Sequence, residues 1–261
     1  MTQEVSDGVT AEYEYTIKSV EPQLVMVRAG NNVTTSTTEF DNMGNATSET
    51  DAMGNTSTTV YDDLGRVTKE TAADGIVTET VYGDKSDGTS YTLVTVKNGS
   101  DIQKKSLTVT DKWGNTILEG TCRVNGDESG MSYETSAGTV VLIDYTENTY
   151  DAAGRLTSST DRYGMTTSNT YDAAGRVLTE TLSKGENSET TAYTYDDAGN
   201  RLIETLPDGT TTTYTYDVLG RVLTETVSKG SDSLTQTAYT YDIVDGTQLR
   251  REPVSYTHLR I

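Results

Sequence analysis

The 261-residue sequence has few of the residues that usually build a globular core, with one Phe, one Trp, one Cys and one His, and only 33% of it is hydrophobic. A single cysteine, Cys122, excludes an internal disulfide, and its neighbours give no zinc or redox spacing. The single histidine, His258, lies in the last four residues, so a Ser-His-Asp or Cys-His arrangement has no base in the body of the chain. These absences argue against an enzyme.

Positive charge is also scarce. The chain has 20 Lys and Arg against 40 Asp and Glu, which gives a formal net charge of −20. Phosphate backbones need basic partners, so this balance excludes nucleic acid and disfavours anionic membranes. No apolar run is long enough to insert into a membrane, and the polar, acidic residues 2–10 do not resemble a signal peptide. The acidity indicates either a soluble surface with charged edge strands or attraction of cations and basic partners.

What the sequence does contain is a repeat, Tyr-Asp-x-x-Gly-Arg, which recurs in four exact copies and in a fifth, at residues 195–201, that has Asn before the Arg. A fixed period indicates one supersecondary unit stacked many times. The repeat signature residues, to which we assign a structural role, are Tyr61, Asp62, Gly65, Arg66, Tyr150, Asp151, Gly154, Arg155, Tyr171, Asp172, Gly175, Arg176, Tyr195, Asp196, Gly199, Tyr216, Asp217, Gly220 and Arg221. Weaker copies that keep Asp and Gly occupy residues 40–45, 51–55, 111–115 and 161–164.

The repeat predicts a particular turn. Asp, two variable residues and Gly suit a type I turn followed by a left-handed glycine, which is a three-residue hairpin loop with a bulge. A second kind of turn is expected at 73–75, 183–185, 207–209 and 228–230. Gly154, Gly164, Gly175 and Gly185 follow one another at intervals of 10, 11 and 10 residues, which leaves room for a strand of ordinary length between turns. The sequence therefore predicts an all-β antiparallel meander without helices.

Between the turns, side chains alternate with period two. In the Tyr-Thr-Tyr strips, Tyr193, Tyr214 and Tyr239 lie on the tyrosine face and threonines on the other. Tyrosine faces stack on pyranose rings, so these three residues are a candidate ligand face, with core or ladder tyrosines as the alternative. The arginine after each Gly either lines a ligand face or forms a ladder, stacked on Tyr or paired with an Asp of a neighbouring repeat.

Clustered carboxylates such as Asp62 with Asp63 raise the question of calcium, which binds oxygen ligands in loops. The repeat offers one carboxylate and then a cation, and it matches neither the EF-hand nor the nonapeptide calcium pattern. We therefore expect no metal site, no cofactor and no catalytic residue, and keep a calcium-stabilised repeat as a third, weaker hypothesis.

The spacing divides the chain into five parts. Residues 1–37 are N-terminal strands that lead into the sheet, 38–82 are regular repeats, and 83–149 are irregular repeats with longer loops in the same sheet. Regular repeats resume over 150–245. Residues 246–261 lack both the spacing and the composition of the repeats, and we interpret them as a tail of native or artefactual origin that carries no functional weight.

Tyr-Asp-x-x-Gly-Arg-[Leu or Val]-x-x-x-Thr, with degenerate copies between, resembles the YD-repeat of the RHS (rearrangement hotspot) family over residues 38–245. The resemblance implies a long twisted sheet that spirals into part of a hollow shell. Bacterial shells of this kind enclose a toxic domain, and other relatives are surface adhesion proteins or are thought to bind carbohydrate. The chain has no Asp-Pro pair, so the self-cleaving core motif of the family does not carry over.

Two functions follow from the resemblance. The first is a non-enzymatic scaffold, a fragment of the shell of a secreted or surface bacterial toxin, whose partners are further repeats and an enclosed toxin domain. The second is a cell-surface module that binds glycans or proteins on its tyrosine face.

Overall fold

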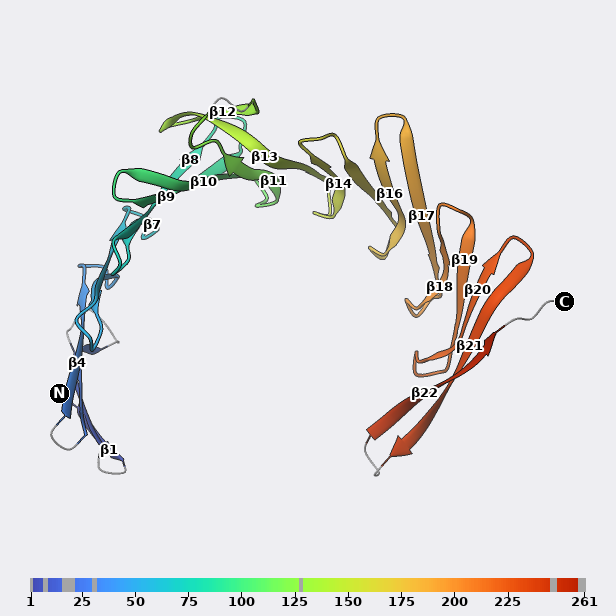
Figure 1. Cartoon of the computed structure of the whole chain (residues 1–261), viewed down its shortest axis with the longest axis horizontal. Helices are drawn as coiled ribbons and strands as arrows, with labels where there is room; N and C mark the ends of the chain where they lie inside the picture. The colour runs from blue at the N-terminus through green and yellow to red at the C-terminus, as the bar shows by residue number, and fades with distance from the viewer. Residues whose placement is uncertain are drawn as a thin grey trace. The chain divides into compact units, whose positions relative to one another are not determined.

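The computed structural model describes residues 2–6, 9–15, 22–29, 32–126, 129–244 and 248–257, which form 22 strands and no helix (Figure 1). The chain divides into two compact units, Met1–Tyr145 and Thr146–Ile261. The all-β class predicted from the sequence is confirmed. His258 and residues 16–20, the end of an expected strand, lie outside the described residues.

The first unit contains twelve described strands and most of a thirteenth, which continues into the second unit. They are β1 Thr2–Ser6, β2 Val9–Tyr15, β3 Pro22–Ala29, β4 Asn32–Phe40, β5 Ala46–Thr50, β6 Thr56–Tyr61, β7 Val67–Thr71, β8 Ile76–Asp84, β9 Ser90–Asn98, β10 Asp101–Thr110, β11 Thr116–Cys122, β12 Met131–Thr135 and β13 Gly138–Tyr150.

The second unit holds the end of β13 and the remaining described strands. These are β14 Leu156–Asp161, β15 Thr166–Tyr171, β16 Val177–Lys184, β17 Asn187–Tyr195, β18 Arg201–Thr205, β19 Thr210–Tyr216, β20 Val222–Lys229, β21 Asp232–Val244 and β22 Gln248–Thr257. Strand β22 lies in the stretch that we interpreted as a tail, and it pairs with β21 from Gln248 to Thr257.

Successive strands pair antiparallel, as the predicted meander requires. In the regular repeats the register shifts at the last residue before each turn, as between Thr170 and Tyr171 on β15. Such a shift is the bulge expected where a left-handed glycine closes a three-residue loop. The exception to simple succession is β13, which pairs with β12, with β11 and, in the second unit, with β14.

The described buried core lies entirely in the first unit. It consists of Tyr91, Leu93, Leu107, Val109, Leu118, Cys122, Val140 and Leu142. The members alternate with period two along β9, β10, β11 and β13, so each of these strands turns one face inward. Part of the stretch that the sequence showed only as loosened repeats is therefore the best-packed part of the molecule.

Contacts between segments distant in sequence close this core. The ring of Tyr91 on β9 meets Tyr133 on β12 edge to face, with centroids 6.0 Å apart. Its hydroxyl accepts a hydrogen bond from the Ser136 backbone N–H at 2.6 Å. On β11, a Cβ at Gly120 would lie 2.3 Å from the Asp144 carbonyl oxygen, so only glycine allows β11 and β13 to approach this closely.

In the second unit, no side chain among the described residues is fully buried. Cross-strand pairs share a face, and the register places Tyr214 opposite Glu225 and Thr215 opposite Thr224. The tyrosine and threonine faces expected from the sequence are therefore both present. On the threonine face, hydroxyls bond in pairs, at 2.6 Å for Thr170 with Thr179 and 2.9 Å for Thr181 with Thr190. Such pairs contribute roughly 0.2–1 kcal/mol each.

Candidate functional site

The recurring turn is built around its aspartate. In the turn that begins at Asp172, one carboxylate oxygen accepts the backbone N–H groups of Ala174 and Arg176, both at 2.9 Å. The Gly175 N–H bonds to the Asp172 carbonyl at 3.1 Å, and Gly175 has a φ of 86°. Asp is suited to this position because a short carboxylate reaches the N–H groups two and four residues on.

The second carboxylate oxygen holds the arginine of the same turn. Arg176 Nε donates to Asp172 Oδ2 at 2.6 Å, and Arg66 Nε donates to Asp62 Oδ2 at 2.8 Å. The sequence had suggested pairing with an Asp of a neighbouring repeat, whereas these ion pairs form within one turn. The hydrogen bond from the Arg176 backbone N–H is the largest cause that lowers the pKa of Asp172 below its usual range. Burial, which comes second, raises that pKa, and the Arg176 guanidinium lowers it further.

Asparagine replaces arginine in several of the turns. Asn200 Nδ2 donates to Asp196 Oδ2 at 2.8 Å, and Asn45 and Asn55 bond in the same way to Asp41 and Asp51. An amide and a guanidinium thus fill the same place, because each presents an N–H donor to the second oxygen. Sequence reasoning missed this equivalence, although an Asn at the fifth position of three weaker copies was a visible signal.

The arginine also reaches the next repeat. The guanidinium carbon of Arg155 lies 4.7 Å from the ring centroid of Tyr171, and that of Arg176 lies 4.8 Å from Tyr195. Arg66 over Tyr82, at 4.2 Å, and Arg221 over Tyr241, at 4.5 Å, repeat the arrangement. Cation–π contacts at exposed sites are worth about 0.5–1 kcal/mol.

The same tyrosine is fixed by its hydroxyl, which donates to the carbonyl of the residue after the turn's arginine or asparagine. Tyr171 donates to the Leu156 carbonyl at 2.7 Å, and Tyr195 donates to Val177 at 2.8 Å. Tyr61, Tyr82, Tyr216 and Tyr241 make the equivalent bond. Neighbouring hairpins are thus joined by this hydrogen bond and, where the turn carries an arginine, also by a ring contact. We call this set of contacts the arginine–tyrosine ladder.

The turns of the second kind divide into two types. Those at Asp74 and Asp208 have the same backbone bonds as the Tyr-Asp turns, for example Leu206 N–H to the Thr210 carbonyl at 2.8 Å. In contrast, Lys184 pairs directly with Asn187, which leaves a two-residue loop that begins with Gly185 at a φ of 60°. Sequence reasoning had grouped all four, because a glycine ends the motif in each.

The candidate ligand face lies on strands β17, β19 and β21. The guanidinium of Arg201 lies 5.4 Å from the ring centroids of both Tyr193 and Tyr214. Burial first, and then the carboxylates of Glu204 and Glu180, raise the pKa of Tyr193. The Tyr239 hydroxyl donates to Glu225 at 3.2 Å. The rings of Tyr193 and Tyr214 therefore already stack on a cation of the chain.

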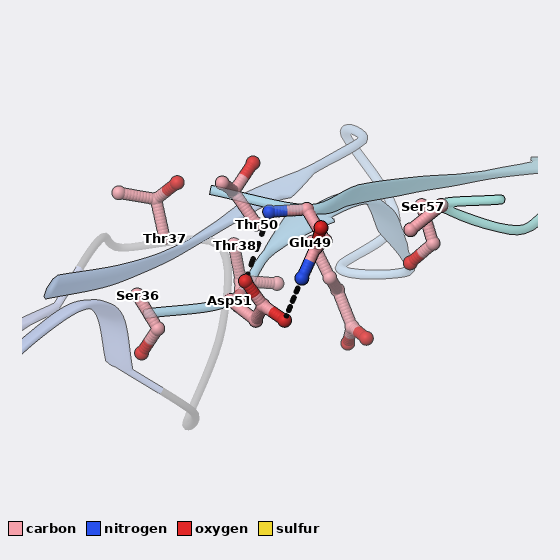
Figure 2. A pocket seen from close by; sticks show the side chains of 9 residues that line it. Ser36, Thr37, Thr38, Glu49, Thr50, Asp51 and Ser57 are labelled. Carbon is pink, nitrogen blue, oxygen red and sulfur yellow. Dashed lines mark hydrogen bonds between the residues drawn. The ribbon is translucent and has the colours of Figure 1, made fainter. Parts of the chain in front are cut away.

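An open hollow of about 420 Å³ lies in the first unit (Figure 2). Its lining is mostly polar and comprises Ser36, Thr37, Thr38, Glu49, Thr50, Asp51, Asn55, Ser57 and Ala73. The Asp51 carboxylate accepts hydrogen bonds from the Asn55 backbone N–H at 2.9 Å and from the Asn55 amide at 2.7 Å. They are the dashed lines that end at Asp51 in Figure 2. Asp51 thus has the same structural role as the other turn aspartates.

Within the described ranges, no group of three His, Cys, Asp or Glu side chains is placed to hold a metal ion. No helix that could cross a membrane is found in the part of the chain that the structure describes. The geometry of the site is that of contacts between neighbouring hairpins.

Recurring turns joined by an arginine–tyrosine ladder define an all-β repeat protein. A family model described as RHS Repeat matches residues 40–77, 150–186 and 195–232. These three stretches are similar to repeats of the RHS, or YD-repeat, family, and the contacts between their hairpins form a repeat scaffold. A comparison with curated proteins gave no match.

Among solved structures, the TcdB2–TccC3 complex with Cdc42 is similar over 85% of this chain and 14% of its own, with 17% identity and a TM-score of 0.42. The Tc holotoxin pore of Photorhabdus luminescens gives the same values. TcdB2–TccC3 alone is similar over 92% of this chain and 16% of its own, with 17% identity and a TM-score of 0.41. This chain thus spans about a seventh of the length of these three toxin chains.

Proposed function

We propose that this chain is a non-enzymatic wall segment of a larger RHS-type shell, part of a secreted or surface-exposed bacterial toxin. The observation that carries the proposal is the arginine–tyrosine ladder. Tyr171, Arg155 and Asp151 contact one another across or within successive turns, and equivalent sets recur along the chain. Residues that recur from repeat to repeat and contact the adjacent repeat are expected to hold the wall together. A single ligand site would need only one set of such residues.

In this proposal, residues 38–82 and 150–245 are regular wall, and 83–149 are wall with longer loops and a local core. Stability in stacked repeats comes from each repeat and its contacts with its neighbours, so a longer chain extends the wall with the same contacts. Further repeats and an enclosed toxin domain are the partners that the family resemblance implies.

The alternative, an adhesion module that stacks sugars on Tyr193, Tyr214 and Tyr239, has less support. Arg201 lies over two of the three rings, so a sugar would have to displace that guanidinium or use the opposite ring faces. Among the described residues, the tyrosine face shows no feature that would favour binding of a sugar over binding of a cation.

The experiment that tests the proposal is to sequence the coding DNA beyond both ends of this chain and to express the complete product. We expect more repeats and an unrelated C-terminal domain that resists protease while the product is intact. Proteolysis of that domain at the rate of the free domain would overturn the shell. A wall-anchoring segment with no such domain would favour the adhesion module.

A further inference from the structure

A second residue recurs with the turns and takes no part in the arginine–tyrosine ladder. Eight residues after the turn aspartate, six of the turns carry a glutamate. The six are Glu49, Glu70, Glu119, Glu180, Glu204 and Glu225. Four of these glutamates are exposed, whereas Glu204 and Glu225 are half-buried. The two half-buried carboxylates need an explanation, because the acidic charge of the chain opposes them.

In the second unit, the register fixes the face of this glutamate. Glu204 on β18 lies directly opposite Tyr193, and Glu225 on β20 lies directly opposite Tyr214. Figure 1 shows these strands, β17 to β20, following one another in the sheet. Cross-strand neighbours share a face, so Tyr193 with Glu204 and Tyr214 with Glu225 are the same pair in successive repeats.

One of the two pairs already holds a guanidinium. Arg201 lies 5.4 Å from the centroids of Tyr193 and Tyr214, and its Nη1 is 3.7 Å from Glu204 Oε2. An aromatic ring and a carboxylate together hold a guanidinium well, because it stacks on one and forms an ion pair with the other. Arg201 with Tyr193 and Glu204 is therefore an example, within this chain, of a guanidinium bound by a Tyr–Glu pair.

The next pair shares Arg201 at the Tyr214 ring but has no arginine paired with its glutamate among the described residues. The residue equivalent to Arg201 is Val222, since each follows the fifth residue of its turn and pairs with the second tyrosine of its strip. Among the described residues, Glu225 forms no ion pair and accepts a hydrogen bond only from the Tyr239 hydroxyl. Glu225 is half-buried and the chain is strongly acidic, so the negative charge is left for a partner to neutralise.

We propose that Tyr214 and Glu225, above Val222, form a docking site for an arginine side chain of a basic partner polypeptide. The guanidinium would lie beside Val222, stacked on the face of the Tyr214 ring that Arg201 leaves open and paired with Glu225, which corresponds to the place of Arg201 one repeat earlier. The complementary charge of the whole chain brings such a segment to this face. The inference concerns a binding property of this chain and does not depend on the shell proposal.

The test is the binding of a fluorescent hexa-arginine peptide to the whole chain at low salt, followed by anisotropy. Glu225→Gln is expected to raise the Kd about fivefold, the size expected when an exposed ion pair and a cation–π contact are both weakened. Glu147→Gln, the matched control, removes the same charge from an exposed position on β13 and is expected to leave the Kd nearly unchanged. Equal effects of the two variants would mean attraction by net charge alone and would overturn the site.

Two further variants test the geometry. Val222→Arg places a guanidinium of the chain itself at the site and is expected to weaken peptide binding as strongly as Glu225→Gln. Arg201→Gln removes the guanidinium from the first pair and is expected to add a second peptide site. Hexa-lysine, which has the same charge but no planar guanidinium, is expected to bind about fivefold more weakly. Unchanged peptide binding by a folded Val222→Arg chain, or equal binding of the two peptides, would overturn the proposal.

Discussion

The strands β9–β13 and the regular hairpins β14–β21 stabilise a sheet in two different ways. In the first region, residues such as Leu93, Leu107 and Leu142 are at most 1% exposed, and a β12–β13 turn reaches back to β9. In the second, no described side chain is fully buried, and neighbouring strands are joined by ring contacts and hydroxyl bonds instead. The polar repeats thus form a sheet through hydrogen bonds and ring contacts between neighbouring hairpins. The irregular region depends instead on buried apolar side chains.

The sharpest test of this difference is one leucine from each region. Leu107→Ala is expected to cost about 2–5 kcal/mol of unfolding free energy, because it leaves a cavity among packed neighbours. Leu223→Ala removes a side chain that is 38% exposed and is expected to cost about 1 kcal/mol or less. Denaturant unfolding combined with hydrogen exchange of β10 and β20 peptides measures both. Equal losses would show that the hairpins also depend on a core.

Acid should act on the hairpins next most strongly, because it reaches every turn aspartate at once. Backbone N–H groups and arginines lower the pKa of Asp151, Asp172 and Asp217 in the folded chain. A lowered folded-state pKa gives stability that is present above the ordinary carboxyl pKa and is lost as the pH falls through the folded value.

We therefore expect exchange protection of β15–β17 to be constant from neutral pH to about pH 5 and to fall below about pH 4. Asp172→Asn should remove part of this dependence at its own turn. Protection that stays flat down to the lowest pH at which the core of the first unit survives would show that the carboxylates do not hold the turns.

A smaller effect is expected from Gly175→Ala, at about 1–2 kcal/mol, because a φ of 86° is strained for a residue with a Cβ. Space is not the reason, since the nearest atom to an added Cβ is 3.9 Å away on Arg155. Ala174→Ser, beside it in the same turn, is the control and should change little. Chemical denaturation measures both, and a neutral Gly175→Ala would contradict the strained backbone.

The smallest change is Tyr171→Phe, which removes the hydroxyl bond to the Leu156 carbonyl and leaves the ring under Arg155. A hydrogen bond of this kind contributes about 0.5–1.5 kcal/mol, so exchange should quicken in β14 and β15 without global loss. Tyr163→Phe, at a turn position that is 66% exposed, is the matched control. If both variants behave alike, the ladder hydroxyl contributes nothing to the hairpins.

The local features of the fold were predictable, because Asp-x-x-Gly and a period of two depend on residues close in sequence. The core was not, since Tyr91 and Ser136 are brought together across 45 residues and Gly120 gives no sign that a backbone passes close to it.

For the candidate site, the positions of the signature residues were predictable from the sequence. The sequence left two alternatives for the arginine, a ligand face and a ladder. Which ring it contacts depends on the bulge at each turn, as where Tyr171 pairs with Val177. The role of Glu225 was hidden, because its partner Tyr214 becomes visible only from the strand register.

The ladder has a direction. Arg155 reaches forward to Tyr171 and Arg176 reaches forward to Tyr195, so each hairpin whose turn carries an arginine offers a guanidinium on one side and a ring on the other. Deleting one residue within a strand would turn its tyrosine to the opposite face. Deleting a whole hairpin, such as the 21 residues from Asp151 to Tyr171, would again set a guanidinium over a ring. A sheet of this design can therefore be lengthened or shortened with its ladder contacts intact only by whole hairpins.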